Sequence, residues 1–184
     1  MALIKSKRTH LEQGFVQVYT GNGKGKTTAA IGLAMRAIGA GLYVYFVQFM
    51  KSFPYSELSV LQAFQPQLTL KRYGNDDFVL KKQPPSAELL ATMHKGLADA
   101  HRAMLSGKYD LIVLDEVLVS IYFKLFSCAE IVRFIKERPN ETELVLTGRY
   151  CPHEIIDSAD LVTEMKEIKH YYRQGVLARK GIES

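Results

Sequence analysis

A loop rich in glycine and lysine, TGNGKGKTT at residues 20–28, constrains this chain more than any other segment. The run before it, Phe15–Thr20, is apolar and β-branched, as in a strand. The run after it, Lys26–Ile38, is rich in Ala, Ile, Leu and Met, as in a buried helix. A strand, a glycine-rich loop and a helix in this order predict a P-loop, whose backbone N–H groups point at phosphates. The alternative is a strand–helix turn that happens to contain Gly and Lys.

Each residue type in this loop suits a nucleoside triphosphate. Glycines let the backbone approach phosphates closely, Lys26 supplies a point charge, and the Thr27 hydroxyl is placed to coordinate Mg²⁺. Lys24 is an additional cation inside the loop, whereas Thr20 stands where the usual pattern begins with glycine. The residues expected to contact the nucleotide are Gly21, Asn22, Gly23, Lys24, Gly25, Lys26, Thr27 and Thr28.

Beyond the loop, short β-branched runs alternate with helical segments. This alternation predicts an α/β fold, with a mostly parallel central sheet and helices on both faces. Residues 14–184 are expected to form a single P-loop domain, and residues 1–13 an N-terminal tail or lid. The further strands are expected at Leu42–Phe49, Leu68–Tyr73, Tyr109–Leu114, Glu143–Thr147 and Asp160–Met165.

Helix signals separate these strands. A short helix is expected near Glu57–Phe64, and a long one begins after the capping residue Ser86. Ser127 and Glu130 have the spacing of a capping box at the start of another helix. Gly74–Pro85 contains Gly, Asp and Pro residues and is predicted to be a long loop.

Charged side chains after strands supply the second part of the expected site. The strand Tyr109–Leu114 delivers Asp115 and Glu116 to the carboxyl edge of the sheet, where ligands bind in open α/β folds. Beside a P-loop this is the Walker-B position, which binds Mg²⁺ directly or through water, and spacing leaves open which carboxylate touches the metal. Arg149 is expected at the same edge, either neutralising triphosphate charge or lying on the surface after a turn. Arg36, on the helix after the loop, is a similar candidate.

Composition limits the other function classes. The net charge is +5, but no run of five basic residues occurs, so we expect no nucleic-acid partner. Neither a membrane span nor a secretory signal is visible, which favours a cytoplasmic protein. Cys128 and Cys151 lack CxxC spacing, and the scattered histidines predict neither a zinc site nor a catalytic triad.

Five segments together resemble one family. They are GNGKGKTTAA with Arg36 on the helix that follows, FVQFMKS, YDLIVLDEV, LTGRYCPHEIIDSADLVTEMKEIKH and YRQGVLARKGIES. In this order they are similar to the P-loop ATP:corrinoid adenosyltransferases of cobalamin synthesis and salvage. The resemblance covers nearly the whole chain from Gly14 onward.

The resemblance implies that a reduced corrinoid, Co(I), attacks the 5′ carbon of ATP, that triphosphate leaves, and that ATP lies reversed in the loop. Cobalt carries no proton, so the protein has to orient the reactants and neutralise the leaving group. Lys26, Thr27 and Glu116 are the implied catalytic residues, with Asp115 supporting Glu116 at Mg²⁺ or Mn²⁺. Lys24, Arg36 and Arg149 are the further triphosphate contacts. A homodimer and a flavoprotein reductase as electron donor are also implied.

Two stretches differ from the family. Some members carry GFTW where this chain has GNDDF, so Phe78 is the candidate to displace the lower cobalt ligand, unless it anchors the loop in the core. Many members have Asp-Tyr where this chain has Tyr122-Phe123. Two other functions remain alternatives: a P-loop ATPase or kinase in which Glu116 orients water, and an ATP-dependent regulatory protein.

Overall fold

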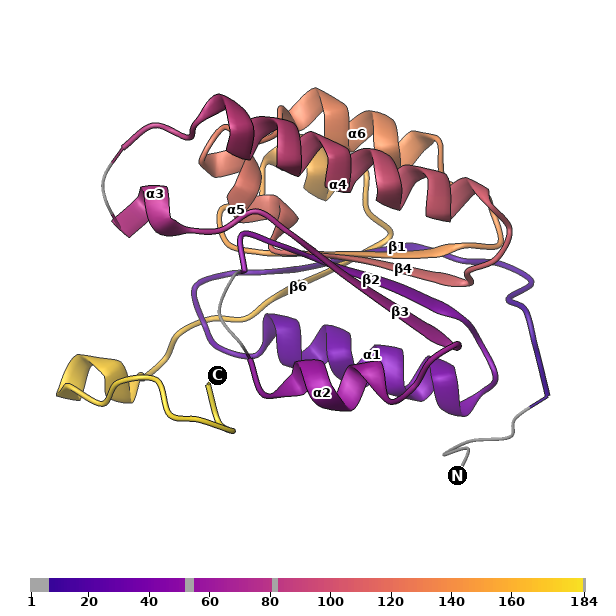
Figure 1. Cartoon of the computed structure of the whole chain (residues 1–184), viewed down its shortest axis with the longest axis horizontal. Helices are drawn as coiled ribbons and strands as arrows, with labels where there is room; N and C mark the ends of the chain where they lie inside the picture. The colour runs from indigo at the N-terminus through magenta and orange to yellow at the C-terminus, as the bar shows by residue number, and fades with distance from the viewer. Residues whose placement is uncertain (1–6, 52–54, 81–82, 184) are drawn as a thin grey trace.

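A parallel sheet forms the centre of the molecule. The computed structural model describes residues 7–51, 55–80 and 83–183, and within these ranges six strands form one sheet in the order β3-β2-β4-β5-β1-β6 (Figure 1). Every pair of neighbouring strands is parallel. The strands are β1 Val16–Thr20, β2 Val44–Phe49, β3 Leu68–Tyr73, β4 Leu111–Asp115, β5 Glu143–Thr147 and β6 Leu161–Glu164.

Helices cover both faces of this sheet, which confirms the predicted α/β fold. In Figure 1, α1 and α2 lie on one face, and α4, α5 and α6 lie on the other. The helices are α1 Lys26–Gly39, α2 Glu57–Gln62, α3 Asp77–Leu80, α4 Ala87–Leu105, α5 Val117–Tyr122, α6 Cys128–Lys136, α7 His153–Asp157 and the 3-10 helix η1 Tyr171–Gln174. None of the helices in the described part of the chain combines the length and apolar character that a membrane span requires.

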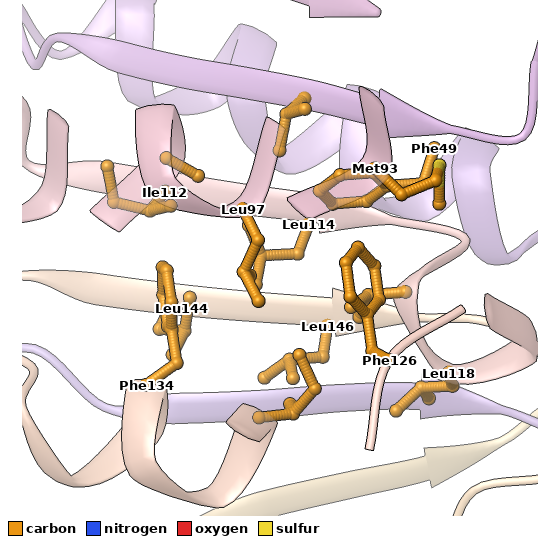
Figure 2. Packing of buried hydrophobic residues seen from close by; sticks show 14 of the residues in the cluster. Phe49, Met93, Leu97, Ile112, Leu114, Leu118, Phe126, Phe134, Leu144 and Leu146 are labelled. Atoms are coloured by element: carbon orange, nitrogen blue, oxygen red, sulfur yellow. The ribbon is translucent and has the colours of Figure 1, made fainter. Parts of the chain in front are cut away.

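The sheet separates two hydrophobic clusters. On one face, Ala30 and Ala34 bring α1 close to Phe46 of β2. On the other, side chains of α4, α5 and α6 interleave above β4 and β5, and Figure 2 shows Leu97 and Phe134 among them. The central strands are therefore covered on both sides, which accounts for their continuous apolar sequences.

The long elements agree with the sequence, as does the short helix α2, which was expected near Glu57–Phe64. The strands and the long helices begin and end within two residues of their expected bounds. The hydroxyl of Ser86 accepts a hydrogen bond from Leu89 N at 3.1 Å, and the capping box of Ser127 and Glu130 is present, so both caps are confirmed.

The prediction that Gly74–Pro85 is loop throughout was wrong, because α3 forms inside it. The side chain of Asn75 accepts a hydrogen bond from the backbone N–H of Asp77, and Phe78 is buried in the core, so local capping and burial stabilise a single turn. The short helices α5 and α7 were not expected either.

The described part of the N-terminal segment contacts the amino edge of the sheet. Arg8 and His10 both contact the buried carboxylate of Asp110, which lies just before β4. Thr9 donates a hydrogen bond to the carbonyl of Ala40. Figure 1 shows this segment at the right, whereas the phosphate loop between β1 and α1 lies at the left. A lid function for residues 1–13 stays a prediction, and residues 1–6 lie outside the described ranges.

Candidate active site

The phosphate loop connects β1 to α1 at the carboxyl edge of the sheet. Gly21 and Gly25 adopt positive φ angles of 96° and 119°, a conformation that favours glycine. The ammonium group of Lys26 folds back over the loop and donates to the carbonyls of Gly21 at 2.7 Å and Gly23 at 2.8 Å. Burial lowers the pKa of Lys26, although the nearby Glu116 opposes that shift. The loop therefore surrounds the ammonium group of Lys26.

Two of the loop glycines also face the segment that leaves β6. The backbone N–H of Gly23 donates to the carbonyl of Met165 at 2.6 Å. A Cβ atom built on either Gly21 or Gly23 would lie 2.6 Å from that carbonyl oxygen. The close approach of two backbones thus requires glycine here, in addition to any approach of a phosphate.

Asp115, at the end of β4, accepts four hydrogen bonds from other side chains. One carboxylate oxygen accepts from the hydroxyls of Thr27 at 2.9 Å and Thr147 at 2.7 Å. The other accepts from Lys51 Nζ at 2.7 Å and from the amide of Gln48 at 3.3 Å. Because β5 neighbours β4 in the sheet, its last residue Thr147 lies beside the acidic pair.

Glu116 differs from its neighbour in both backbone and side chain. Its φ angle of 63° is left-handed, and its N–H donates to Thr147 Oγ1 at 3.0 Å. Among the residues that the structure describes, its carboxylate has no hydrogen-bond or ion-pair partner. Burial, followed by the charge of Asp115, raises the pKa of Glu116. A left-handed non-glycine residue with an unpaired, desolvated carboxylate is typical of functional sites.

Lys51 is a site residue to which the sequence analysis assigned no role. It follows β2 at the same edge of the sheet, and its side chain is 12% exposed. Besides Asp115, it donates to Thr27 Oγ1 at 3.0 Å. Burial favours the neutral amine, yet the contact with Asp115 outweighs it and raises the pKa of Lys51. A charged residue two positions after a buried strand was the available signal, similar to the one that identified Asp115.

These side chains line one open cavity of ≈ 640 Å³. Lys26, Thr27 and Thr28 line it on the side of the phosphate loop and α1, and Lys51, Glu116 and Arg149 line it as well. Its volume is in the range of cavities that hold a nucleotide-sized ligand. Lysine and arginine side chains, threonine hydroxyls and the carboxylate of Glu116 thus converge on one space.

The C-terminal segment contributes a wall that no sequence pattern indicated. Gly181, Ile182 and Glu183 line the cavity. Glu183 accepts hydrogen bonds from Lys24 Nζ at 3.2 Å and from the Tyr171 hydroxyl, and it pairs with Arg179. The bond to Glu183 raises the pKa of Lys24. Lys24 therefore lies at the cavity with its charge already paired.

Of the remaining predicted residues, Arg149 lies at the cavity, whereas Arg36 and Phe78 lie elsewhere. Arg149 lines the same cavity and also a neighbouring hollow that Asn22 lines. Arg36 lies in the last turn of α1, about 15 Å along the helix from Lys26, and does not line the cavity. Phe78 packs edge-on against Phe123 with ring centroids 5.6 Å apart. This packing agrees with the alternative in which Phe78 anchors its loop in the core.

The oxygen donors fit a magnesium ion. Mg²⁺ prefers oxygen ligands and is usually held by one or two carboxylates together with substrate phosphates. Thr27 Oγ1 and an oxygen of Asp115 already share a cation, the ammonium group of Lys51. Within the described ranges no group of three or more His, Cys, Asp and Glu residues could hold a metal. Phosphate and water oxygens would complete the coordination of an ion held here.

Fold and site together define the class of the protein. A strand, a glycine-rich loop and a helix, with an acidic pair at the end of a nearby parallel strand, make it a P-loop nucleotide-binding α/β protein. The family model described as ATP:corrinoid adenosyltransferase BtuR/CobO/CobP matches residues 12–184. The chain belongs to this family, and it is accordingly an enzyme of the transferase type whose substrates are ATP and a corrinoid.

Similar curated proteins carry the same description. A corrinoid adenosyltransferase of Escherichia coli K12 is 34% identical over 173 residues, which cover 94% of this chain and 86% of that protein. The Salmonella typhimurium protein named corrinoid adenosyltransferase CobA has the same identity and coverage. A corrinoid adenosyltransferase of Pseudomonas aeruginosa is 31% identical, over 94% of this chain and 84% of its own length.

Proposed function

We propose that the cavity holds the triphosphate of ATP as a leaving group while a reduced corrinoid attacks the 5′ carbon of the ribose. The observation that carries this proposal is the convergence of Lys26, Lys51 and Arg149 on one cavity. A Co(I) nucleophile has no proton to lose, so catalysis needs charge neutralisation and orientation more than a general base. The cavity supplies positive charge where triphosphate forms.

We assign the metal ligands from the hydrogen bonds of the acidic pair. Both oxygens of Asp115 accept hydrogen bonds from side chains, whereas the carboxylate of Glu116 is unpaired among the described residues. This difference supports Glu116 as the direct ligand, with Thr27, and Asp115 as the group that holds Thr27 in place. Mg²⁺ bound there would neutralise charge on the phosphate oxygens.

The chain's own residues orient the nucleotide. Lys26 leaves the carbonyls of Gly21 and Gly23 to contact phosphate, and the loop N–H groups donate to phosphate oxygens. Arg149 approaches from the end of β5. A homodimer, a flavoprotein electron donor and a cytoplasmic location are predictions that rest on the family resemblance alone.

One assay tests the function. The protein is mixed with ATP, Mg²⁺ and chemically reduced corrinoid, and the products are examined for a light-sensitive cobalt–carbon bond and for inorganic triphosphate. Both products are expected in equal amounts. Release of single phosphate without corrinoid would instead identify an ATPase, and ATP binding without any turnover would favour a regulatory protein.

Variants test the site. Lys26→Ala and Glu116→Ala are each expected to abolish turnover, because one removes the phosphate-binding charge and the other the metal ligand. Circular dichroism should show both variants folded. Arg36→Ala is the matched control, since Arg36 does not line the cavity, and it should keep near-normal turnover. Normal activity in Lys26→Ala or Glu116→Ala would refute the assignment.

A further inference from the structure

We infer that Lys51 is a resident counter-cation of the metal site, which Mg²⁺ displaces when it binds. The inference rests on the proposed function in one respect, the position of the metal beside Thr27. In this structure the ammonium group of Lys51 lies 3.0 Å from Thr27 Oγ1 and 2.7 Å from Asp115 Oδ2. A metal ligated by Thr27 would need the same oxygen and the same volume.

Two cations do not share this position. The Lys51 side chain is 12% exposed and Asp115 is fully buried, so little water screens the repulsion between an ammonium group and a divalent ion. Entry of the metal therefore breaks both contacts of Lys51 with Asp115 and Thr27. The ammonium group then needs another anionic partner, because an unpaired buried charge is costly.

The nucleotide supplies that partner. Lys51 lines the same cavity as Lys26 and Arg149, so its freed ammonium group can turn toward the triphosphate without leaving the site. The ring of Tyr55, whose centroid is 5.3 Å from Lys51 Nζ, lines the cavity as well. Metal binding alone breaks the ion pair between Lys51 and Asp115. When triphosphate binds with the metal, a new ion pair between Lys51 and the triphosphate takes its place. Lys51 thus couples the two binding events and joins the positive charges around the leaving group.

The test measures Mn²⁺ binding without nucleotide, from the electron paramagnetic resonance signal of free Mn²⁺. Lys51→Met keeps the length of the side chain and removes its charge. We expect this variant to bind Mn²⁺ roughly tenfold more tightly than the unaltered protein. Because linkage is reciprocal, Mg²⁺ should also increase ATP affinity by a smaller factor in Lys51→Met.

Two further variants separate competition at the site from a general charge effect. Lys71 is an exposed lysine on β3, so Lys71→Met removes the same charge elsewhere and should leave Mn²⁺ affinity unchanged. Adding Asp115→Asn to Lys51→Met should abolish the increase in Mn²⁺ affinity. Equal or weaker Mn²⁺ binding by Lys51→Met, or an equal gain in Lys71→Met, would overturn the inference.

A measurement on the unaltered protein covers the case in which Lys51→Met does not fold. Acetic anhydride labels accessible amines, and mass spectrometry compares Lys51 with Lys71. Saturating Mg²⁺ without nucleotide should increase labelling of Lys51, and ATP should then protect it. Unchanged or reduced labelling with Mg²⁺ would refute displacement. Neither readout requires turnover, so absence of adenosyl transfer would count against the proposed function and leave this inference standing.

Discussion

At the scale of single residues, Thr147 shows how one hydroxyl organises the acidic pair. It donates to Asp115 Oδ1 at 2.7 Å and accepts from Glu116 N at 3.0 Å. Its side chain is fully buried at the end of β5. It therefore fixes the orientation of one carboxylate and helps to hold the left-handed backbone of the other. The sequence drew attention to Arg149, two residues further on, and not to this threonine.

We expect Thr147→Val to reduce both stability and turnover. Valine has nearly the same shape but leaves a buried carboxylate oxygen and a backbone N–H with one partner fewer, which costs about 1–3 kcal/mol. Thermal unfolding and the adenosyl-transfer assay measure the two effects. Thr147→Ser keeps the hydroxyl and is the matched control, so it should retain most of the turnover. Full activity in the valine variant would show that the bridge is dispensable.

At the scale of elements, α6 is anchored by the capping box between Ser127 and Glu130. Ser127 Oγ accepts from Glu130 N at 3.2 Å, and Ser127 N donates to the Glu130 carboxylate at 2.8 Å. His94 of α4 lies 3.2 Å from the same carboxylate and links the two helices. Burial alone would raise the pKa of Glu130, but the hydrogen bonds from Ser127 outweigh it and lower the pKa.

The depressed pKa of Glu130 gives this cap a defined pH dependence. Its contribution to stability is complete above the ordinary pKa of 4.5 and is lost as the pH falls through the lowered value. At neutral pH, Ser127→Ala should cost about 1 kcal/mol, or roughly 2–4 °C in Tm. The Tm difference between the protein and Glu130→Gln should shrink below pH 4.5. A difference that stays constant with pH would exclude this role for the ionised carboxylate.

Element length explains most of the helix predictions, although the 6-residue helix α2 was expected and is present. The long helix α4 shows its apolar stripe over several turns, so periodicity identified it. The helices α5 and α7 have 6 and 5 residues, too few for a period to emerge. Their formation depends on packing, since Leu118 of α5 and Ile155 of α7 are fully buried in the core.

At the scale of the whole molecule, parallel topology made much of the site predictable. Parallel strands end at one edge, so a loop after β1 and carboxylates after β4 were expected to meet, and Thr27 does contact Asp115. The C-terminal wall was not predictable. Lys24 and Glu183 are separated by 159 positions, and no periodicity or motif in the tail links them. Arg36 was a candidate because it lies on the helix after the loop, but the course of α1 carries it away from the cavity.

Ligand binding should stabilise the molecule as a whole. A ligand that binds only the folded state at a concentration of 100 times its Kd adds about 2.7 kcal/mol, which corresponds to a rise of roughly 5–10 °C in Tm. We expect this rise with ATP and Mg²⁺, and a smaller one when a chelator removes the metal. Differential scanning fluorimetry measures both. An equal shift in Lys26→Ala would place the nucleotide outside the phosphate loop.

The contact of Gly21 and Gly23 with Met165 bears on how tolerance to substitution is interpreted. In a mutational scan scored only by the abundance of folded protein, both positions should be depleted of every side chain, because each Cβ would lie 2.6 Å from a backbone oxygen. Intolerance at a phosphate-loop glycine is usually attributed to the ligand. In this chain the same intolerance also arises from the close backbone packing between the loop and the segment after β6. A selection for folded protein, carried out without any substrate, would therefore detect this intolerance.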